Sequence, residues 1–143
     1  MKELLTPEFP FILAIESSCD DTSVAILRGE KVLSNIVASQ SIHQEYGGVF
    51  PELAARAHQE NIIPTLELAL KKANITLKDL HAIAFTQGPG LVGSLLVANA
   101  FAKSLSMALQ IPLIGVNHLK GHILAHLLED LGKENTFEQA ELI

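Results

Sequence analysis

Residues 11–39, FILAIESSCDDTSVAILRGEKVLSNIVAS, decide the fold of this chain. Two β-favouring runs, Phe11–Ser17 and Thr22–Arg28, flank a short polar segment, which is the pattern of a β-hairpin. Gly29-Glu30 is typical of a two-residue turn, and Lys31–Ser39 then alternates as a third antiparallel strand. The chain is therefore expected to open with a three-stranded meander.

Helical and extended patterns alternate over the rest of the chain. Pro51 suits the first turn of a helix whose apolar residues recur at helical spacing as far as Leu70. Pro64 is expected to kink that helix or to end its first part. The later elements expected are a strand at Ala82–Thr86, a helix at Leu91–Leu109, a strand at Ile111–Val116 and a helix from the cap residue Asn117 to Asp130. The order βββαβαβα predicts an α/β fold, a mixed sheet with flanking helices like those of ribonuclease-H-like and actin-like domains.

Composition and charge narrow the class of protein. With 143 residues and a 48% share of hydrophobic side chains, the chain is expected to fold as one globular domain. Cys19 is its single cysteine, which favours a reducing compartment, and no secretory signal is visible, so a cytoplasmic location is expected. The longest apolar stretch, Leu91–Leu109, contains Lys103 and is expected to be a buried helix and not a membrane span. The net charge of −6, with the basic residues scattered, predicts weak binding of nucleic acid by this chain alone.

His118 and His122 are the strongest indication of chemistry in the sequence. Four residues apart, they share one face of a helix and lie about 5.4 Å apart along its axis, which suits one divalent ion. Zinc or iron requires at least one further protein ligand and an open position for substrate, so the pair is half of such a site. The alternative, two surface or capping histidines, stays open on spacing alone. His126 lies about 12 Å from His118 along the axis and is expected to be an ordinary surface histidine.

The loop between the first two expected strands carries acids and hydroxyls. Glu16, Asp20 and Asp21 lie there among Ser and Thr residues. Such a loop can direct N–H groups and hydroxyls toward a phosphate, while a carboxylate handles a proton or a metal-bound water. The simpler alternative is a turn that uses Asp and Ser because they tolerate turn geometry.

A glycine-rich loop at residues 88–93, GPGLVG, matches the G-x-G-x-x-G pattern. A dinucleotide site is rejected, because Pro89 occupies a turn position, the preceding strands read as antiparallel, and no acidic residue lies about 20 residues further on. The glycines are expected instead to permit a tight turn into a helix whose small residues allow close packing; these are Gly93, Ser94, Ala98, Ala102 and Ser106. Glu52, Arg56 and His58 are expected on a solvated, salt-paired helix face.

Four segments in this order resemble the TsaD (YgjD/Gcp) family and together cover nearly the whole chain. They are Glu16-Ser17-Ser18-Cys19-Asp20-Asp21-Thr22, Gly47-Gly48 to His58, Thr86-Gln87-Gly88-Pro89-Gly90-Leu91-Val92-Gly93-Ser94-Leu95 and Val116-Asn117-His118-Leu119-Lys120-Gly121-His122. The resemblance implies a lobe of a two-lobed fold similar to the actin-like and Hsp70-like ATPases. It also implies a metal-dependent acyltransferase. This enzyme would move a threonylcarbamoyl group from threonylcarbamoyl-AMP to N6 of the adenosine next to the anticodon, in tRNAs that read ANN codons.

By the same resemblance, His118 and His122 are two ligands of an iron or zinc ion, and Asp20 and Asp21 orient the substrate or accept the amine proton. Residues 1–143 correspond to the N-terminal lobe. The second lobe, with an aspartate as third ligand and a Ser-Gly-Gly loop for the adenylate, is expected beyond this chain. The expected partners are tRNA, threonylcarbamoyl-AMP, a TsaB-like paralogue and a TsaE-like ATPase, with no membrane. Alone, the fragment is expected to be inactive and to form homodimers through its exposed lobe interface.

Two departures from the family pattern and two other functions remain to be considered. Asp21 stands where many members carry Glu, which affects how far the hairpin acid reaches, and Ser17 stands where many carry Thr. A zinc-dependent glycoprotein endopeptidase would need a general base beside the ligands, yet the segment from His118 to His122 contains no Glu, unlike H-E-x-x-H. A non-catalytic actin-like lobe would hold no metal and leave both histidines solvated.

Overall fold

One mixed sheet organises the residues that the computed structural model describes, 9–40 and 47–130. Its strands are β1 (Phe11–Glu16), β2 (Thr22–Arg28), β3 (Lys31–Ala38), β4 (Ala82–Gly88), β5 (Leu113–Asn117) and β6 (Glu129–Asp130). β1, β2 and β3 form the predicted antiparallel meander. β4 pairs with β1 in parallel, and β5 pairs with β4 in parallel, so the order across the sheet is β5-β4-β1-β2-β3-β6. This arrangement confirms the predicted α/β class.

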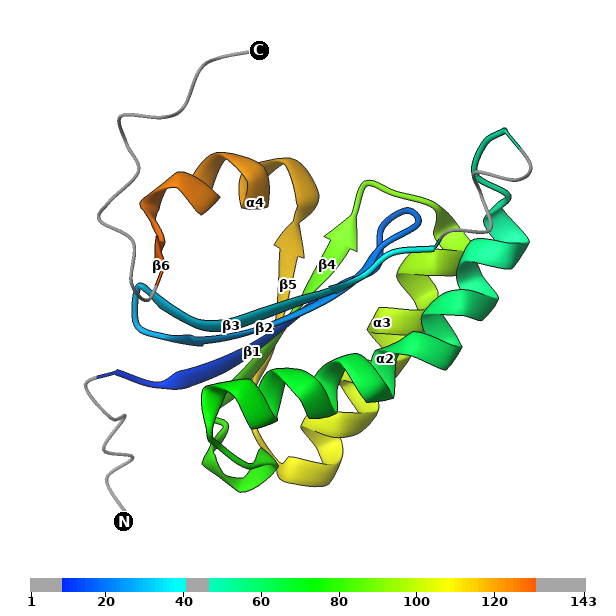
Figure 1. Ribbon diagram of the computed structural model, residues 1–143. Helices are drawn as coiled ribbons and strands as arrows, with labels where there is room; N and C mark the ends of the chain where they lie inside the picture. Colours follow the sequence, from blue (N-terminus) through cyan, green and yellow to red (C-terminus); the bar gives the residue numbers. More distant parts are fainter. Residues whose placement is uncertain (1–8, 41–46, 131–143) are drawn as a thin grey trace.

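Helices lie on both faces of this sheet (Figure 1). They are α2 (Pro51–Ala73), the 3-10 turn η1 (Leu77–Asp79), α3 (Val92–Leu109), α4 (His118–Leu124) and the 3-10 turn η2 (Ala125–Leu127). α2 and α3 lie side by side against one face, where α2 contacts β2 and β3, and α3 contacts β4. α4 follows β5 directly and lies over the other face. Two long helices therefore cover one face of the sheet, while the short helix α4 covers only part of the other face. A groove forms between α4 and that second face.

The hydrophobic core lies between the sheet and the pair α2 and α3. Successive side chains of a strand point to opposite faces, and on this side Leu13, Val24 and Ile26 are fully shielded from solvent. Side chains of both helices complete the same cluster; they include Ile62, Leu66, Ala69, Ala98 and Ala102. Burial of apolar surface at this interface is the main force that holds the helices to the sheet.

Two predictions about helix boundaries can be compared with the structure. Pro64 does not end α2, which continues through it to Ala73, while the kink that was the other expectation stays a prediction. The Pro64 side chain is on the exposed side of α2, where the carbonyl that loses its helical partner can bond to water instead. The helix expected to reach Asp130 ends at Leu124, because the following residues turn through η2 and pair as β6 with the outer edge of β3. That pairing satisfies backbone groups of an edge strand, which local helical patterning cannot foresee.

α3 is buried along one stripe and not throughout, which corrects the prediction of a buried helix. Ser94, Ala98 and Ala102, spaced four residues apart, have no exposed surface. A Cβ on Gly93 would lie 3.4 Å from the Cβ of Ala55 in α2, so the small residues do permit the close helix packing that was expected. With a mean hydropathy of 1.4, α3 is long and apolar enough to cross a membrane, a test that core helices also pass.

The loop that leads into α3 touches the β1–β2 hairpin. The Leu91 N–H donates a hydrogen bond to the Ser18 carbonyl oxygen at 2.7 Å. A Cβ built on Gly90 would lie 2.6 Å from that same oxygen, a distance that real Cβ atoms do not reach. The predicted tight turn into the helix is therefore confirmed, and Gly90 is the glycine that this contact requires.

Replacing Gly90 by Ala is expected to push the loop away from the hairpin and to lower the free energy of unfolding by about 1–3 kcal/mol, the usual cost of overpacking. Urea unfolding measures this loss. Gly48→Ala is the control, since a Cβ at Gly48 meets no atom within 4 Å. Equal stability of the Gly90→Ala variant and the unmodified chain would show that the loop and the hairpin do not need this close approach.

Candidate functional site

Three parallel strands end at one edge of the sheet and bring the polar residues of the site together. β1 ends at Glu16, β4 at Gly88 and β5 at Asn117. Since β1, β4 and β5 are neighbours and run in the same direction, their carboxyl ends meet. The Asn117 side chain accepts a hydrogen bond from the Lys120 N–H at 3.1 Å, which confirms Asn117 as the predicted helix cap. His118 is thereby the first residue of α4, directly above this edge.

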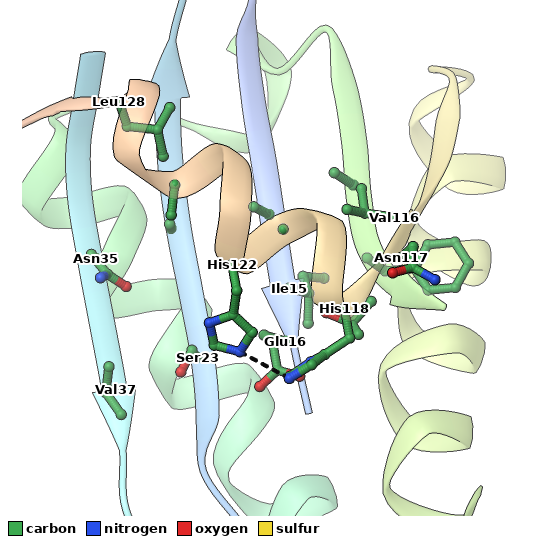
Figure 2. Close-up of a pocket in the computed structure, with 17 residues that line it drawn as sticks. Ile15, Glu16, Ser23, Asn35, Val37, Val116, Asn117, His118, His122 and Leu128 are labelled. Carbon is green, nitrogen blue, oxygen red and sulfur yellow. Dashed lines mark hydrogen bonds and ion pairs between the residues drawn. The ribbon is translucent and has the colours of Figure 1, made fainter. Parts of the chain in front are cut away.

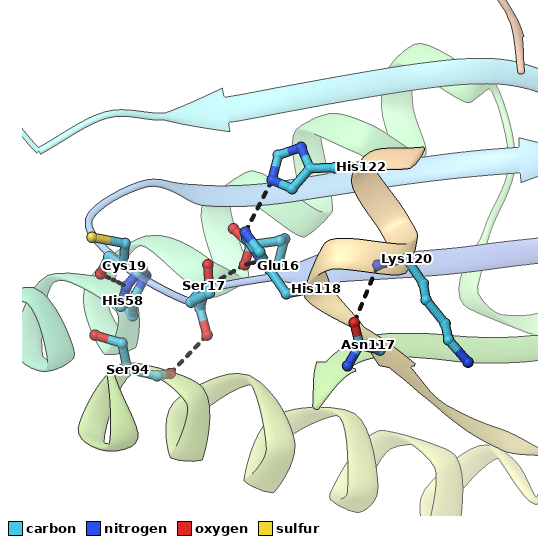
Figure 3. Close-up of polar contacts among 10 residues, drawn as sticks. Glu16, Ser17, Cys19, His58, Ser94, Asn117, His118, Lys120 and His122 are labelled. Carbon is cyan, nitrogen blue, oxygen red and sulfur yellow. Dashed lines mark hydrogen bonds and ion pairs between the residues drawn. The ribbon is translucent and has the colours of Figure 1, made fainter. Parts of the chain in front are cut away.

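The rings of His118 and His122 face each other across one turn of α4. Their Nε2 atoms are 2.9 Å apart and their ring centroids 4.6 Å apart, with an angle of 73° between the ring planes. At this distance one ring donates its N–H to the other (Figures 2 and 3). Nitrogens bound at about 2.0–2.1 Å to a tetrahedral zinc ion stand about 3.3 Å apart. The rings therefore fit one shared ion after opening by a few tenths of an ångström.

A groove of about 470 Å³ lies between α4 and the sheet, and both histidines line it. Small side chains on this face of the sheet leave the space; they are Ala14, Ala25 and Ala84, from three adjacent strands. Figure 2 shows His118 and His122 in this groove together with Glu16. Within the described ranges, no group of three or more His, Cys, Asp or Glu residues is spaced to hold a metal ion.

Glu16, one of the three acids expected in the polar loop, lies beside the histidines and apart from Asp20 and Asp21. Its Oε1 lies 3.6 Å from His118 Nδ1, within ion-pair distance, and accepts a hydrogen bond from the Ser18 N–H at 2.7 Å. The side chains of His118 and Glu16 are 25% and 35% exposed, so the contact is partly shielded from water. The strand order could have revealed this contact. β1 and β5 run parallel on either side of β4, and Glu16 is the last residue of β1 as Asn117 is the last residue of β5.

Asp20 and Asp21 line a different hollow from the one that the histidines line. Their neighbours there are Ser39, Gln40, Gly47, Gly48 and Val49. The catalytic role expected for these two acids stays a prediction. Cys19, beside them, has a thiol whose pKa is raised, first by desolvation and then by the charge of Asp20. A raised pKa lowers the fraction of the nucleophilic thiolate, so nothing in its surroundings activates Cys19.

His58 is fully buried, which corrects its expected place on a solvated face. Its Nε2 lies 2.9 Å from the Cys19 carbonyl oxygen, and its Nδ1 lies 2.7 Å from the Thr22 hydroxyl. A carbonyl only accepts, so Nε2 carries the proton and donates, while Nδ1 accepts from Thr22. His58 thus joins α2 to the middle of the β1–β2 loop and to the first residue of β2, and Figure 3 shows its contact with Cys19.

The helical spacing of its neighbours could have revealed the burial of His58. Ala54, His58, Ile62 and Leu66 recur every four residues along α2, and all four are buried. Among the residues that the structure describes, Glu52 and Arg56 form no ion pair with each other, and both side chains are exposed. The prediction of a solvated, salt-paired face is therefore wrong on two points, because Glu52 and Arg56 do not form an ion pair and His58 is buried.

Comparison with known proteins shows the family to which the chain belongs. The family model described as "TsaD: tRNA N6-adenosine threonylcarbamoyltransferase" matches residues 31–137. This chain belongs to the TsaD family. A relative from Christiangramia forsetii is 66% identical over 119 residues, which are 83% of this chain and 35% of that protein. A relative from Porphyromonas gingivalis is 57% identical over 124 residues, 87% of this chain and 36% of that protein. Both carry the name tRNA N6-adenosine threonylcarbamoyltransferase, and the chain spans about a third of their length.

Solved structures support the fold that the TsaD family implies. YeaZ from Pseudomonas aeruginosa matches with a TM-score of 0.63 at 26% identity, over 82% of this chain and 46% of that one. A crystal structure described as an uncharacterized protein with similarity to peptidase YeaZ, from the same organism, matches with a TM-score of 0.60 at 29% identity, with the same coverage. The predicted actin-like, ribonuclease-H-like fold is confirmed.

His58→Ala is expected to lower the free energy of unfolding by roughly 2–4 kcal/mol, because it opens a cavity in the core, leaves the buried Thr22 hydroxyl without its partner and removes the hydrogen bond to the Cys19 carbonyl. Urea unfolding of the chain measures the loss. Arg56→Ala, on the exposed side of the same helix, serves as the control and should change stability by less than about 0.5 kcal/mol. A loss no greater than that of the control would show that His58 does not hold the loop.

Proposed function

We propose that this chain is the N-terminal lobe of a tRNA N6-adenosine threonylcarbamoyltransferase. The observation that carries the proposal is the pair of Nε2 atoms, 2.9 Å apart at the mouth of a groove, in a chain of the TsaD family. The reaction transfers threonylcarbamoyl from threonylcarbamoyl-AMP to N6 of the adenosine next to the anticodon. The second lobe lies outside this chain, so residues 1–143 alone are inactive in this proposal.

His118 and His122 would hold one divalent ion, iron or zinc, through Nε2. Neutral imidazole suits both metals, and a third ligand, an aspartate, would come from the second lobe. A bound ion would supply Lewis-acid chemistry toward the adenylate and the reacting carbonyl. The groove supports this role, because both histidines line it and the His118 side chain, 25% exposed, is partly shielded from water.

In the transfer, the N6 amine attacks the carbamoyl carbon, the bond from that carbon to the phosphate oxygen breaks, and AMP leaves with its electron pair. The proton lost by the amine must pass to a base. Asp20 and Asp21 are assigned to orient the substrate or to accept that proton. Their hollow shares no lining residue with the groove of the histidines, which favours the orienting role for both acids.

No observation favours the endopeptidase alternative. A general base would have to stand beside the ligands, as in H-E-x-x-H, and the residues between His118 and His122 are Leu119, Lys120 and Gly121. Cytoplasmic location is part of the proposal and rests on the lone cysteine, Cys19.

His118→Ala, placed in a protein of full family length that carries this chain, is expected to lose bound metal and to reduce transfer roughly 100-fold or more, since Lewis-acid stabilisation is worth several kcal/mol. Elemental analysis and a tRNA modification assay measure the two effects. His126→Ala, an exposed histidine beyond the end of α4, is the control and should change neither. Normal metal content with normal modification in His118→Ala would refute the proposal.

The partners proposed are tRNA, a TsaB-like paralogue and a TsaE-like ATPase. With a net charge of −6 the chain has little means of binding phosphates by itself, so other subunits would supply part of the tRNA affinity. The paralogue is assigned to the outer side of α3, where Val92, Leu96 and Met107 are 73%, 60% and 75% exposed along one face. Exposed apolar side chains gathered on a helix mark a protein interface.

Leu96→Asp is expected to weaken binding of the TsaB-like partner at least about tenfold, because it replaces an exposed apolar side chain on this side of α3 with a charged one. Isothermal titration with the purified partner measures the affinity. Lys78→Asp, on exposed η1, introduces the same side chain away from α3 and should leave binding unchanged. Equal affinity of the Leu96→Asp variant and the unmodified chain would remove this face from the interface.

A further inference from the structure

Glu16 meets the edge of the His118 ring that does not face His122. The Nε2 atoms of the two rings approach each other, while His118 Nδ1 lies 3.6 Å from Glu16 Oε1 (Figure 3). A histidine that ligates a metal through one nitrogen carries a proton on the other, and that N–H needs an acceptor. Glu16 offers a carboxylate oxygen on the side where the acceptor would be needed.

We infer that Glu16 is the positioning residue of the metal site, which holds His118 in the tautomer that presents Nε2 to the ion. A carboxylate beside Nδ1 favours the Nδ1–H form and turns the ring edge toward the groove. The carboxylate also raises the basicity of the ligating nitrogen. Glu16 therefore acts on the ion through His118. The inference rests on the proposed function, since it assumes that the two histidines hold the ion.

The carboxylate of Glu16 is held in place before any ion arrives. The Ser18 N–H donates to Oε1 at 2.7 Å, which ties the side chain to its own backbone two residues further on. The backbone of Glu16 is the last ladder position of β1, opposite Ser23 of β2. A fixed acceptor lowers the conformational entropy lost when the ring is oriented, so Glu16 is better placed for this role than an acid on a loop tip.

A carboxylate lies beside His118 but not beside His122 in the described part of the chain, and this difference provides a specific test of the inference. His122 is exposed, and among the described residues its ring has the Nε2 contact and the ring contact with His118 and no carboxylate partner. Loss of the Glu16 charge should therefore change the environment of His118 and leave that of His122 nearly as it was.

The experiment is a Zn²⁺ titration of the 143-residue chain, followed by calorimetry and by long-range ¹H–¹⁵N correlation spectra of ¹⁵N-labelled histidine. Glu16→Gln keeps the size of the side chain and the acceptor for the Ser18 N–H but removes the charge. It is expected to raise the dissociation constant for Zn²⁺ about 10- to 100-fold, the usual effect of losing such a partner. In the Zn²⁺-loaded chain it should move the ring ¹⁵N resonances of His118 and not those of His122.

Glu30→Gln is the matched control, because it removes one carboxylate from the exposed turn between β2 and β3. It should leave the affinity and both sets of resonances unchanged. Equal weakening by Glu30→Gln would mean that net charge alone acts, and an unchanged affinity in Glu16→Gln would overturn the positioning role. If His118→Ala and His122→Ala also leave the Zn²⁺ affinity unchanged, the proposed metal site itself fails, so the two failures are distinguishable.

Discussion

The parallel pairing of β1, β4 and β5 is the constraint on which the site depends. Hydrogen bonding in this direction places Ile15 opposite Phe85 and Thr86 opposite Val116. The three strands then end at the same edge of the sheet. The last residue of each strand, and the residue that follows it, therefore lie close to those of the neighbouring strands. Glu16 closes one strand and His118 follows another, so two side chains separated by about a hundred residues come within ion-pair distance.

The β1–β2 hairpin, which carries Asp20 and Asp21, is held at this edge by contacts from the two core helices. The Ser17 hydroxyl donates to the Ser94 carbonyl of α3 at 2.7 Å, and the His58 Nε2–H donates to the Cys19 carbonyl at 2.9 Å. A third bond joins the loop before α3 to the hairpin backbone. Backbone carbonyls at a tight loop need such partners when they are buried. The hairpin is therefore tied to both core helices and to the loop before α3, which sets its position beside the groove and the hollow of the acids.

Much of the fold could be predicted because its patterns are local. The meander, the strands at β4 and β5, the Asn117 cap and the convergence of His118 and His122 all follow from periods of two or of 3.6 residues and from turn residues. The features that could not be predicted depend on contacts between residues far apart in the sequence. His58 is a polar residue in an apolar stripe, and only its bonds across to the hairpin explain it. The early end of α4 depends on the free edge of β3.

The sequence indicates only some of the residues that meet at the candidate site. A pair of histidines one turn apart is visible in the sequence, whereas the contact of Glu16 with His118 requires the order of strands across the sheet, which a single sequence does not state. Family resemblance added the reaction and the second lobe as expectations. The resemblance did not indicate that Asp20 and Asp21 line one hollow while His118 and His122 line another.

The central claim is that the Nε2 atoms of His118 and His122 bind one ion between them. Anomalous X-ray diffraction from crystals of the chain soaked in Zn²⁺ tests it most directly. The account predicts one anomalous peak at about 2.0–2.1 Å from both Nε2 atoms, at the mouth of the groove under α4. A soaked crystal with no peak there, or with Zn²⁺ bound to one histidine while the other ring points away, would contradict it.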